Sequence, residues 1–249
     1  PFRSIFSSLF GRIENSTWEV IITDFRLPKA ITAILVGSGL GISGLLMQTL
    51  FRNPLAGPFV LGISSGASLG VALVILGSGL FGGAFAASLT TKWSIVIAAS
   101  LGSFLVLLAV LAVSSKVRDT MAILIIGLMF GSITAAVVSV LSYFSSAEQL
   151  QQYIFWGFGS LSNLSWNELL IFLGIYLIGL LLSILSIKGL NSLLLGDNYA
   201  KSLGLNLKQN RLIIIIATSL IAGTITAFAG PIAFIGLAIP HITKLLFNT

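Results

Sequence analysis

The most constraining feature of this chain is a series of long stretches that contain no charged side chain. One covers residues 30–50, and another covers residues 53–91. An α-helix needs roughly 20 apolar residues to cross the hydrocarbon core of a bilayer. Because lipid offers no hydrogen-bond partners, a spanning segment must satisfy its own backbone. These stretches therefore predict membrane-spanning helices.

The composition of the whole chain agrees with this prediction. Of its 249 residues, 56% are hydrophobic and 8% are charged, whereas a soluble domain carries about 25% charged residues. Strand-like alternation is absent, which argues against an outer-membrane barrel. The 26 glycines are typical of closely packed membrane helices. The predicted fold class is all-α, a polytopic transmembrane helical bundle.

We expect one transmembrane domain over residues 1–249, with seven spanning segments. They are residues 30–50, 60–80, 93–115, 120–144, 168–187, 212–229 and 232–247. Gly62, Gly66 and Gly70 recur every four residues and predict a ridge for helix packing. The chain begins with Pro1 and ends just after an apolar segment, so we expect both ends to be cut from a longer protein.

Several kinds of chemistry find no support in the sequence. There is no cysteine for a disulfide or thiolate site, and no Gly-Lys pair for a phosphate-binding loop. The lone histidine, His241, is expected to hydrogen-bond a neighbouring carbonyl, since metal sites need several ligands. The net charge of +6 is spread over loops and does not indicate nucleic acid. We expect no catalytic residue, no metal and no cofactor.

The longest polar interval between two predicted spans covers residues 195–211. Its charged residues are Asp197, Lys201, Lys208 and Arg211. We expect a short helix over residues 198–203, with Asp197 as its N-cap and Gly204 as its C-terminal stop. Such a helix suits docking onto a soluble partner. The alternative is a solvated loop without a special role.

Alternate loops differ in how many basic residues they hold, and this difference predicts how the chain is oriented in the membrane. The richer side holds Arg52, Lys116, Arg118, Lys188, Lys201, Lys208, Arg211 and Lys244. The poorer side holds Arg3, Arg12, Arg26, Lys29 and Lys92. The richer side should be cytoplasmic. Residues 195–211 then lie in the cytoplasm.

Arg26 and Lys29 are expected on the outer side. They are three residues apart and share one helix face. Such a pair can receive a carboxylate from an external partner. The alternative is two cations that simply sit at a membrane interface, where Lys and Arg are tolerated.

Ordered motifs along nearly all of the chain resemble those of one family. They are Arg26-Leu27-Pro28-Lys29, GSGLGISGLLMQ at 37–48, Arg52-Asn53-Pro54-Leu55-Ala56, LGISSGA at 61–67, WGFGS at 156–160, LGD with Ala200 and Leu203-Gly204, and GPIAFIGLAIPH at 230–241. Together they resemble the FecCD-type permease subunits of bacterial ABC importers for iron–siderophore, haem and cobalamin. Many motifs in the right order make this resemblance specific.

The resemblance implies the type II permease fold of ABC importers, with ten transmembrane helices, of which this chain would hold the second to the eighth. It implies a multi-pass protein in the lipid of the bacterial cytoplasmic (inner) membrane, acting as a homodimer or with a paralogous permease. The implied partners are a cytoplasmic ABC ATPase subunit, which hydrolyses ATP, and a periplasmic or lipoprotein substrate-binding protein. The chain itself would not be an enzyme.

The resemblance also assigns roles to individual residues. The ATPase-coupling residues would be Leu195, Gly196, Asp197, Ala200, Leu203 and Gly204. The family usually has Glu where Asp197 stands. Arg26 and Lys29 would dock the binding protein, although Lys in place of the family's second Arg loses bidentate geometry. A cytoplasmic gate would lie near Val117, Arg118, Asp119 and Thr120. It would serve a pathway along the dimer axis, lined by the fourth span.

The sequence therefore predicts a permease subunit that moves an iron(III)–siderophore or a similar metal chelate inward. The first rival is a secondary transporter driven by an ion gradient, which usually needs buried carboxylates, and none of the seven acidic residues falls inside a firm span. An intramembrane enzyme and a purely structural membrane subunit are the other rivals. The motifs do not distinguish siderophore from haem or cobalamin.

Overall fold

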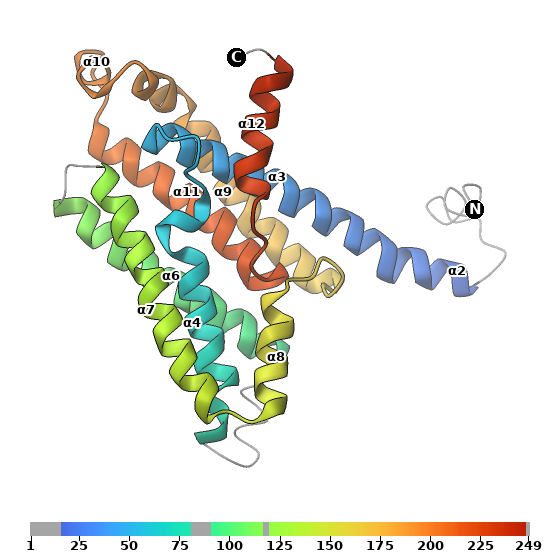
Figure 1. Ribbon diagram of the computed structural model, residues 1–249. Coiled ribbons are helices and arrows are strands. Elements are labelled where there is room, and N and C mark those ends of the chain that lie inside the picture. The colour runs from blue at the N-terminus through green and yellow to red at the C-terminus, as the bar shows by residue number, and fades with distance from the viewer. Residues whose placement is uncertain (1–15, 81–90, 117–119, 248–249) are drawn as a thin grey trace.

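The computed structural model describes residues 16–80, 91–116 and 120–247. Within these ranges the chain forms helices and no strand (Figure 1), which confirms the predicted all-α class. The helices are α2 (Ser16–Val20), the π-helix η1 (Ile21–Arg26), α3 (Leu27–Phe51), the 3₁₀-helix η2 (Pro58–Leu61), α4 (Ile63–Ile75), the 3₁₀-helix η3 (Gly77–Leu80), α6 (Lys92–Lys116), α7 (Thr120–Phe144), α8 (Ala147–Gly157), α9 (Trp166–Leu194), α10 (Asp197–Ser202), α11 (Leu207–Ala229) and α12 (Ile235–Phe247).

Helix α11 is the centre of the bundle. It packs against α9, α3, α6 and α4, and 72% of an apolar stretch of 18 residues within it is buried. Helix α7 lies on the outside of the bundle, and only 11% of the corresponding 18-residue stretch of α7 is buried. The exposed surface of α7 is therefore available to lipid or to another chain.

The tightest packing joins α4 to α6 through glycines. A Cβ atom added at Gly66 would overlap the carbonyl oxygen of Gly102, and one at Gly102 would overlap that of Gly66. Gly70 approaches the backbone of Ala98 in the same way. The predicted ridge is correct for these two glycines of α4. Gly62 serves differently, because it takes a left-handed φ of 71° and caps the start of α4.

Two segments predicted to span the membrane are shorter in the structure. Helix α4 has 13 residues, and the cap at Gly62 separates it from η2. Helix α12 begins at Ile235 because Gly230 and Phe234 both adopt positive φ angles. A helix of 13 residues is about 20 Å long, less than the roughly 30 Å hydrocarbon core. Five described helices are long and apolar enough to cross: Thr17–Phe51, Lys92–Val110, Ile125–Phe144, Trp166–Leu194 and Leu207–Ala229.

The first of these helices also begins earlier than predicted. Pro28 lies in the first turn of α3, but η1 and α2 precede it without a break in the helix. Proline lacks an N–H group and its ring clashes with the carbonyl four residues before it. The wider π-turn of η1 accommodates this defect. The N-terminal part of this long helix projects from the bundle as an arm (Figure 1).

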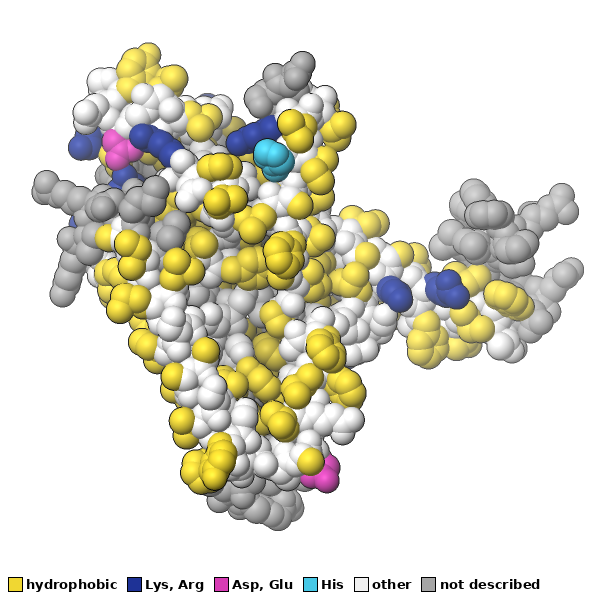
Figure 2. Space-filling model, viewed as in Figure 1, with side chains coloured by type: hydrophobic (Ala, Val, Ile, Leu, Met, Phe, Trp, Pro, Cys, Tyr) yellow, Lys and Arg dark blue, Asp and Glu magenta, His cyan; other side chains and the backbone are white. Residues whose placement is uncertain are grey.

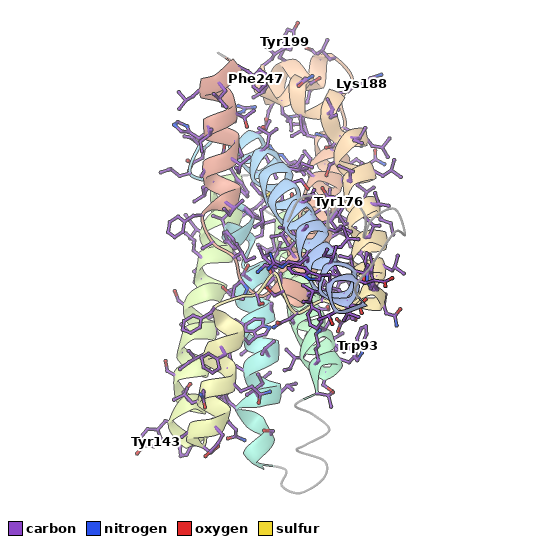
Figure 3. The ribbon with its side chains drawn as sticks, turned by 90° about the vertical axis from the view of Figure 1, so that its right-hand side faces the viewer. Trp93, Tyr143, Tyr176, Lys188, Tyr199 and Phe247 are labelled. Carbon is purple, nitrogen blue, oxygen red and sulfur yellow. The ribbon has the colours of Figure 1, made fainter. Side chains whose placement is uncertain are left out.

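The two ends of the bundle carry different elements. Tyr199 of α10, Lys188 near the end of α9 and Phe247 of α12 lie at one end (Figure 3). Tyr143, near the end of α7, and Trp93, near the start of α6, lie toward the other. We call these the α10 end and the α8 end.

Candidate functional site

Helix α10 is a short, well-defined element between α9 and α11. Gly196 precedes it with a φ of 110°, and Gly204 follows it with a φ of 82°. A Cβ atom at either glycine would meet nothing within 4 Å, so the backbone angle and not the space requires glycine there. The Gly204 N–H donates to the Lys201 carbonyl at 2.9 Å and the Leu205 N–H to the Ala200 carbonyl at 3.0 Å. These two bonds form a Schellman motif, so Gly204 stops the helix as predicted.

The prediction that Asp197 is the N-cap of this helix is wrong. Gly196 occupies the cap position without any side-chain hydrogen bond, and Asp197 is the first helical residue. The Asp197 carboxylate turns toward two arginines instead. Its Oδ1 accepts from Arg52 Nη2 at 2.9 Å and its Oδ2 from Arg211 Nη2 at 2.5 Å. Charge-assisted bonds of this kind are stronger than a bond to a neutral backbone N–H.

Arg52 connects α10 to two further helices. It follows the last residue of α3, and its Nη2 also donates to the Leu193 carbonyl at 2.7 Å, near the end of α9. Arg211 belongs to the first turns of α11. We call Arg52, Asp197 and Arg211 the Asp197 cluster. It joins α3, α9, α10 and α11 at one point, and neither arginine was predicted to contact Asp197.

The predicted coupling residues divide into buried and exposed groups. Ala200 is fully buried and belongs to the same core cluster as Leu193 and Ile214, so it anchors α10 and does not itself touch a partner. Leu195 is 65% exposed and Leu203 is 59% exposed. Leu194 and Tyr199, which sequence reasoning missed, are exposed beside them.

These four exposed side chains form what we call the α10 patch: Leu194, Leu195, Tyr199 and Leu203. Figure 2 shows apolar side chains at the tip of the molecule that carries α10, with basic and acidic side chains close below. An apolar patch rimmed by charges marks an interaction site when it faces water. The patch is the surface of the segment best suited to a protein partner.

Arg26 and Lys29 lie on the projecting arm. Arg26 is the last residue of η1 and Lys29 belongs to the first turn of α3. Both side chains are exposed, and Figure 2 shows basic side chains on the arm. Trp166 of α9 donates from Nε1 to the Thr23 carbonyl at 3.1 Å, which ties the arm to the bundle.

The predicted gate falls mostly on residues that the structure does not describe. Val117, Arg118 and Asp119 lie outside the described ranges, and Thr120 is the first residue of α7. The gate therefore stays a prediction.

A second polar cluster lies toward the α8 end and was not predicted. Glu168 is only 4% exposed and is the third residue of the apolar helix Trp166–Leu194, so the expectation that no acidic residue falls inside a firm span is wrong for this carboxylate. Its Oε2 accepts from Lys92 Nζ at 2.7 Å, from Ser165 N at 2.7 Å and from Ser165 Oγ at 2.9 Å. The spacing Ser165-x-x-Glu168 is a capping box at the start of α9, a signal that could have revealed this role.

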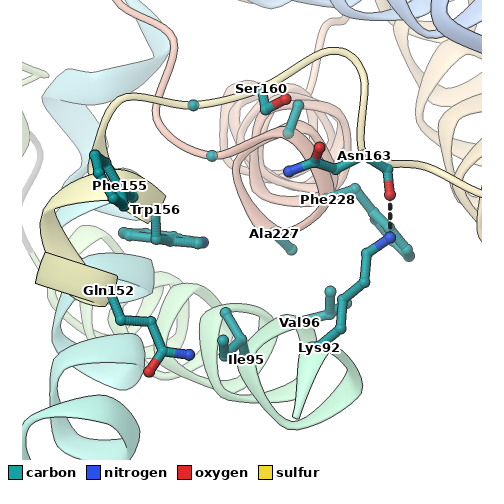
Figure 4. A pocket seen from close by; sticks show the side chains of 13 residues that line it. Lys92, Ile95, Val96, Gln152, Phe155, Trp156, Ser160, Asn163, Ala227 and Phe228 are labelled. Atoms are coloured by element: carbon teal, nitrogen blue, oxygen red, sulfur yellow. Dashed lines mark hydrogen bonds between the residues drawn. The ribbon is translucent and has the colours of Figure 1, made fainter. Parts of the chain in front are cut away.

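A cavity of about 460 Å³ adjoins this cluster (Figure 4). Lys92, Gln152, Trp156, Ser160 and Asn163 line it. Lys92 Nζ donates to the Asn163 carbonyl as well as to Glu168. The lysine charge is therefore matched by a carboxylate, and the cavity wall offers hydrogen bonds without a net charge.

The described ranges hold no cluster of three or more His, Cys, Asp or Glu side chains that could hold a metal ion. His241 lies on α12 and is exposed. The candidate site is the exposed α10 patch together with the Asp197 cluster beside it.

Comparison with known proteins agrees with the sequence motifs. The model of the FecCD transport family matches residues 1–249. The hemin transport system permease protein HmuU of Yersinia pestis is 35% identical over 241 residues, which cover 96% of this chain and 71% of that protein. The vitamin B12 import system permease protein BtuC of Klebsiella pneumoniae is 36% identical over 237 residues, covering 94% of this chain and 68% of that protein.

A solved structure gives the same result at the level of the fold. It is described as an inward-facing metal-chelate type ABC transporter and superimposes with a TM-score of 0.84 at 30% sequence identity. The match covers 100% of this chain and 79% of that chain.

Proposed function

The chain belongs to the FecCD transport family and is a permease subunit of an ABC importer in the inner membrane, and from that premise we propose that it carries an iron(III)–siderophore or a similar metal chelate. It is a multi-pass membrane protein and not itself an enzyme. A permease of this kind works with a separate ATPase and a substrate-binding protein. The cargo, the docking residues and the dimer are parts of the proposal.

The observation that carries the proposal is the α10 patch. Four large apolar side chains are exposed on one short segment, which lies at the end of the bundle where the positive-inside rule puts the cytoplasm. A surface of this kind in water is stabilised by burial against another protein. We assign the patch to the ATPase, and we assign Gly196, Gly204 and the buried Ala200 to holding it in place.

We assign docking of the binding protein to Arg26 and Lys29 on the arm, which the positive-inside rule puts on the outer side of the membrane. Both are exposed cations three residues apart. A carboxylate on the binding protein would complete an ion pair with each, and such pairs govern the rate and orientation of docking more than its strength.

The second permease subunit is assigned to the exposed face of α7. Ile125, Met129, Ile133 and Val140 are exposed large apolar residues along this helix. Two copies of the face, or one copy with a paralogue, would enclose a pathway on the dimer axis. The predicted gate, of which only Thr120 at the start of α7 is described, would close that pathway.

The cargo proposal rests on the relatives and on the polarity of the helices. HmuU and BtuC are named for hemin and vitamin B12, which are both bulky metal chelates. Helix α7 carries no charged side chain, so its exposed face would contact a chelate by shape and not by charge. An ion-gradient transporter is less favoured, because the buried carboxylate of Glu168 is already neutralised by Lys92.

Transport measured with purified components tests this function. The whole subunit is reconstituted in proteoliposomes with its ATPase and binding protein, and a ferric siderophore, hemin and cobalamin are offered in parallel. We expect uptake of a ferric siderophore that requires ATP on the ATPase side. Uptake of only hemin or only cobalamin would replace the siderophore with another metal chelate, and uptake of none of the three would overturn the cargo assignment. Uptake driven by a proton gradient without the ATPase would overturn the importer mechanism.

A further inference from the structure

We infer that Arg52 and Arg211 are positioning residues that transmit movement of α10 to the membrane helices α3 and α11, through the shared carboxylate of Asp197. This inference rests on the proposed docking of the ATPase on α10. It concerns the step after docking, because it explains how a displacement of the short helix reaches the membrane helices α3 and α11.

The geometry gives each arginine its own carboxylate oxygen. Arg52 Nη2 lies 2.9 Å from Oδ1, and Arg211 Nη2 lies 2.5 Å from Oδ2. Because both oxygens are bound, α10 cannot shift at its first residue without displacing at least one arginine. Arg52 also holds the Leu193 carbonyl at 2.7 Å. A movement of α10 is thus shared between the ends of α3, α9 and α11.

The backbone of Arg52 provides an independent observation. The Asn53 N–H donates to the Gln48 carbonyl at 3.1 Å and the Arg52 N–H to the Thr49 carbonyl at 3.3 Å. This is a Schellman motif, in which Arg52 adopts the left-handed conformation at φ 48°. Glycine is the usual residue there, since a side chain makes that conformation unfavourable. Glycine would end α3 with less strain but could not reach Leu193 or Asp197.

The exposure of the cluster suits a linkage more than a stabilising core. The Arg52 and Asp197 side chains are 47% and 40% exposed, whereas the Arg211 side chain is 17% exposed. The Arg52–Asp197 pair is accessible to water and contributes little to stability, because solvent and salt screen it. Loss of Arg52 should therefore leave the bundle folded. Its effect should appear in the link between α10 and the other helices.

The same segment offers matched controls. Lys201 and Lys208 are exposed and make no ion pair with any described residue. Neutralising either one changes the charge of the α10 end as much as neutralising Arg52 does. Any effect that is specific to Arg52 and Arg211 is then due to the contacts with Asp197.

The test uses the whole importer, with permease, ATPase and binding protein, in proteoliposomes. The main variant is Arg52→Gly, which removes the guanidinium but suits the left-handed backbone. Arg211→Gln is the second variant, and Lys201→Gln and Lys208→Gln are the controls. Three quantities are measured: ATPase binding to the permease, ATP hydrolysis, and cargo transported for each ATP hydrolysed.

We expect Arg52→Gly and Arg211→Gln to bind the ATPase as the wild type does, and to lower the cargo transported per ATP by about tenfold. Arg52→Lys should retain part of this ratio, because it keeps one charge near Asp197. Lys201→Gln and Lys208→Gln should transport as much cargo for each ATP hydrolysed as the wild type does.

Three outcomes would overturn the inference. A wild-type ratio in Arg52→Gly would show that the contact transmits nothing, while leaving the docking proposal intact. Loss of ATPase binding in Arg52→Gly and Arg211→Gln alone would mean that the arginines shape the docking surface and do not transmit movement. Failure of the wild-type permease to bind any ATPase would overturn the proposed docking and this inference together.

Discussion

At the scale of single residues, conformation and charge explain positions that hydropathy does not. Gly196 and Gly204 are needed for their backbone angles, and Arg52 is kept in a conformation that favours glycine. Each of these residues lies at the end of a helix. The orientation of α10 therefore depends on a few residues outside the helix itself.

Gly204→Ala is expected to weaken ATPase binding. The left-handed conformation costs a non-glycine residue about 1–2 kcal/mol, so the end of α10 should rearrange and Leu203 should move. Gly157→Ala is the control, since its Cβ would also meet nothing within 4 Å and its φ is not positive. Binding of the ATPase to detergent-solubilised permease measures both variants. Equal affinities would contradict the argument.

Glu168 is expected to matter for stability through its capping box and its contact with Lys92. Glu168→Ala should lower the free energy of unfolding by about 1–2 kcal/mol, mainly because a helix cap is lost. The lost ion pair with Lys92 adds little, since the Lys92 side chain is half exposed. Glu168→Gln should be milder, since glutamine also completes a capping box. Thermal unfolding in detergent compares the two. If Glu168→Gln is as harmful as Glu168→Ala, the charge and not the cap determines the effect.

At the scale of helices, uncharged stretches predicted where helices occur better than where they end. The prediction ended one helix at residue 187 because Lys188 follows, yet α9 continues to Leu194. A lysine near the end of a membrane helix can extend its charged group to the interface, so its charge does not end the helix. The start of α4 was missed because the cap at Gly62 looks like one more member of a glycine ridge.

Contacts between distant segments were the part that sequence could not supply. Arg52 and Asp197 are far apart in the chain, and no local pattern predicts that their side chains meet. Ala200 was predicted at the docking surface, but it is fully buried in the same core cluster as Leu193 and Ile214. Local rules do describe the cap at Gly204 and the capping box at Glu168, because those bonds join neighbours in sequence.

The packing of α4 on α6 is expected to be sensitive to the smallest change. Gly102→Ala places a methyl group against the Gly66 carbonyl, and backbone on both sides leaves nothing flexible to move. Overpacking of this kind costs about 1–3 kcal/mol. Gly174→Ala on α9 meets nothing within 4 Å and should be neutral or stabilising. Thermal unfolding in detergent should separate the two variants; equal midpoints would contradict the close packing.

At the scale of the whole molecule, the two ends of the bundle present different surfaces. The α10 end combines an exposed apolar patch with the Asp197 cluster, whereas the α8 end has a neutral cavity beside a lysine paired with Glu168. The central helix α11 connects them, running from Arg211 in its first turns to Ala229 at the cavity wall. A displacement at the α10 end can therefore reach the other end of the bundle along one continuous, mostly buried helix.

The most direct test of this account is the affinity of the ATPase for a permease with a charged α10 patch. Leu195→Glu combined with Leu203→Glu places two carboxylates on exposed positions of the patch, and Gln209→Glu adds a charge at an exposed position outside it. The account predicts that the double variant folds normally and binds the ATPase at least about tenfold more weakly, whereas Gln209→Glu binds as the wild type does. Unchanged affinity in the double variant would contradict the assignment of the α10 patch to the ATPase.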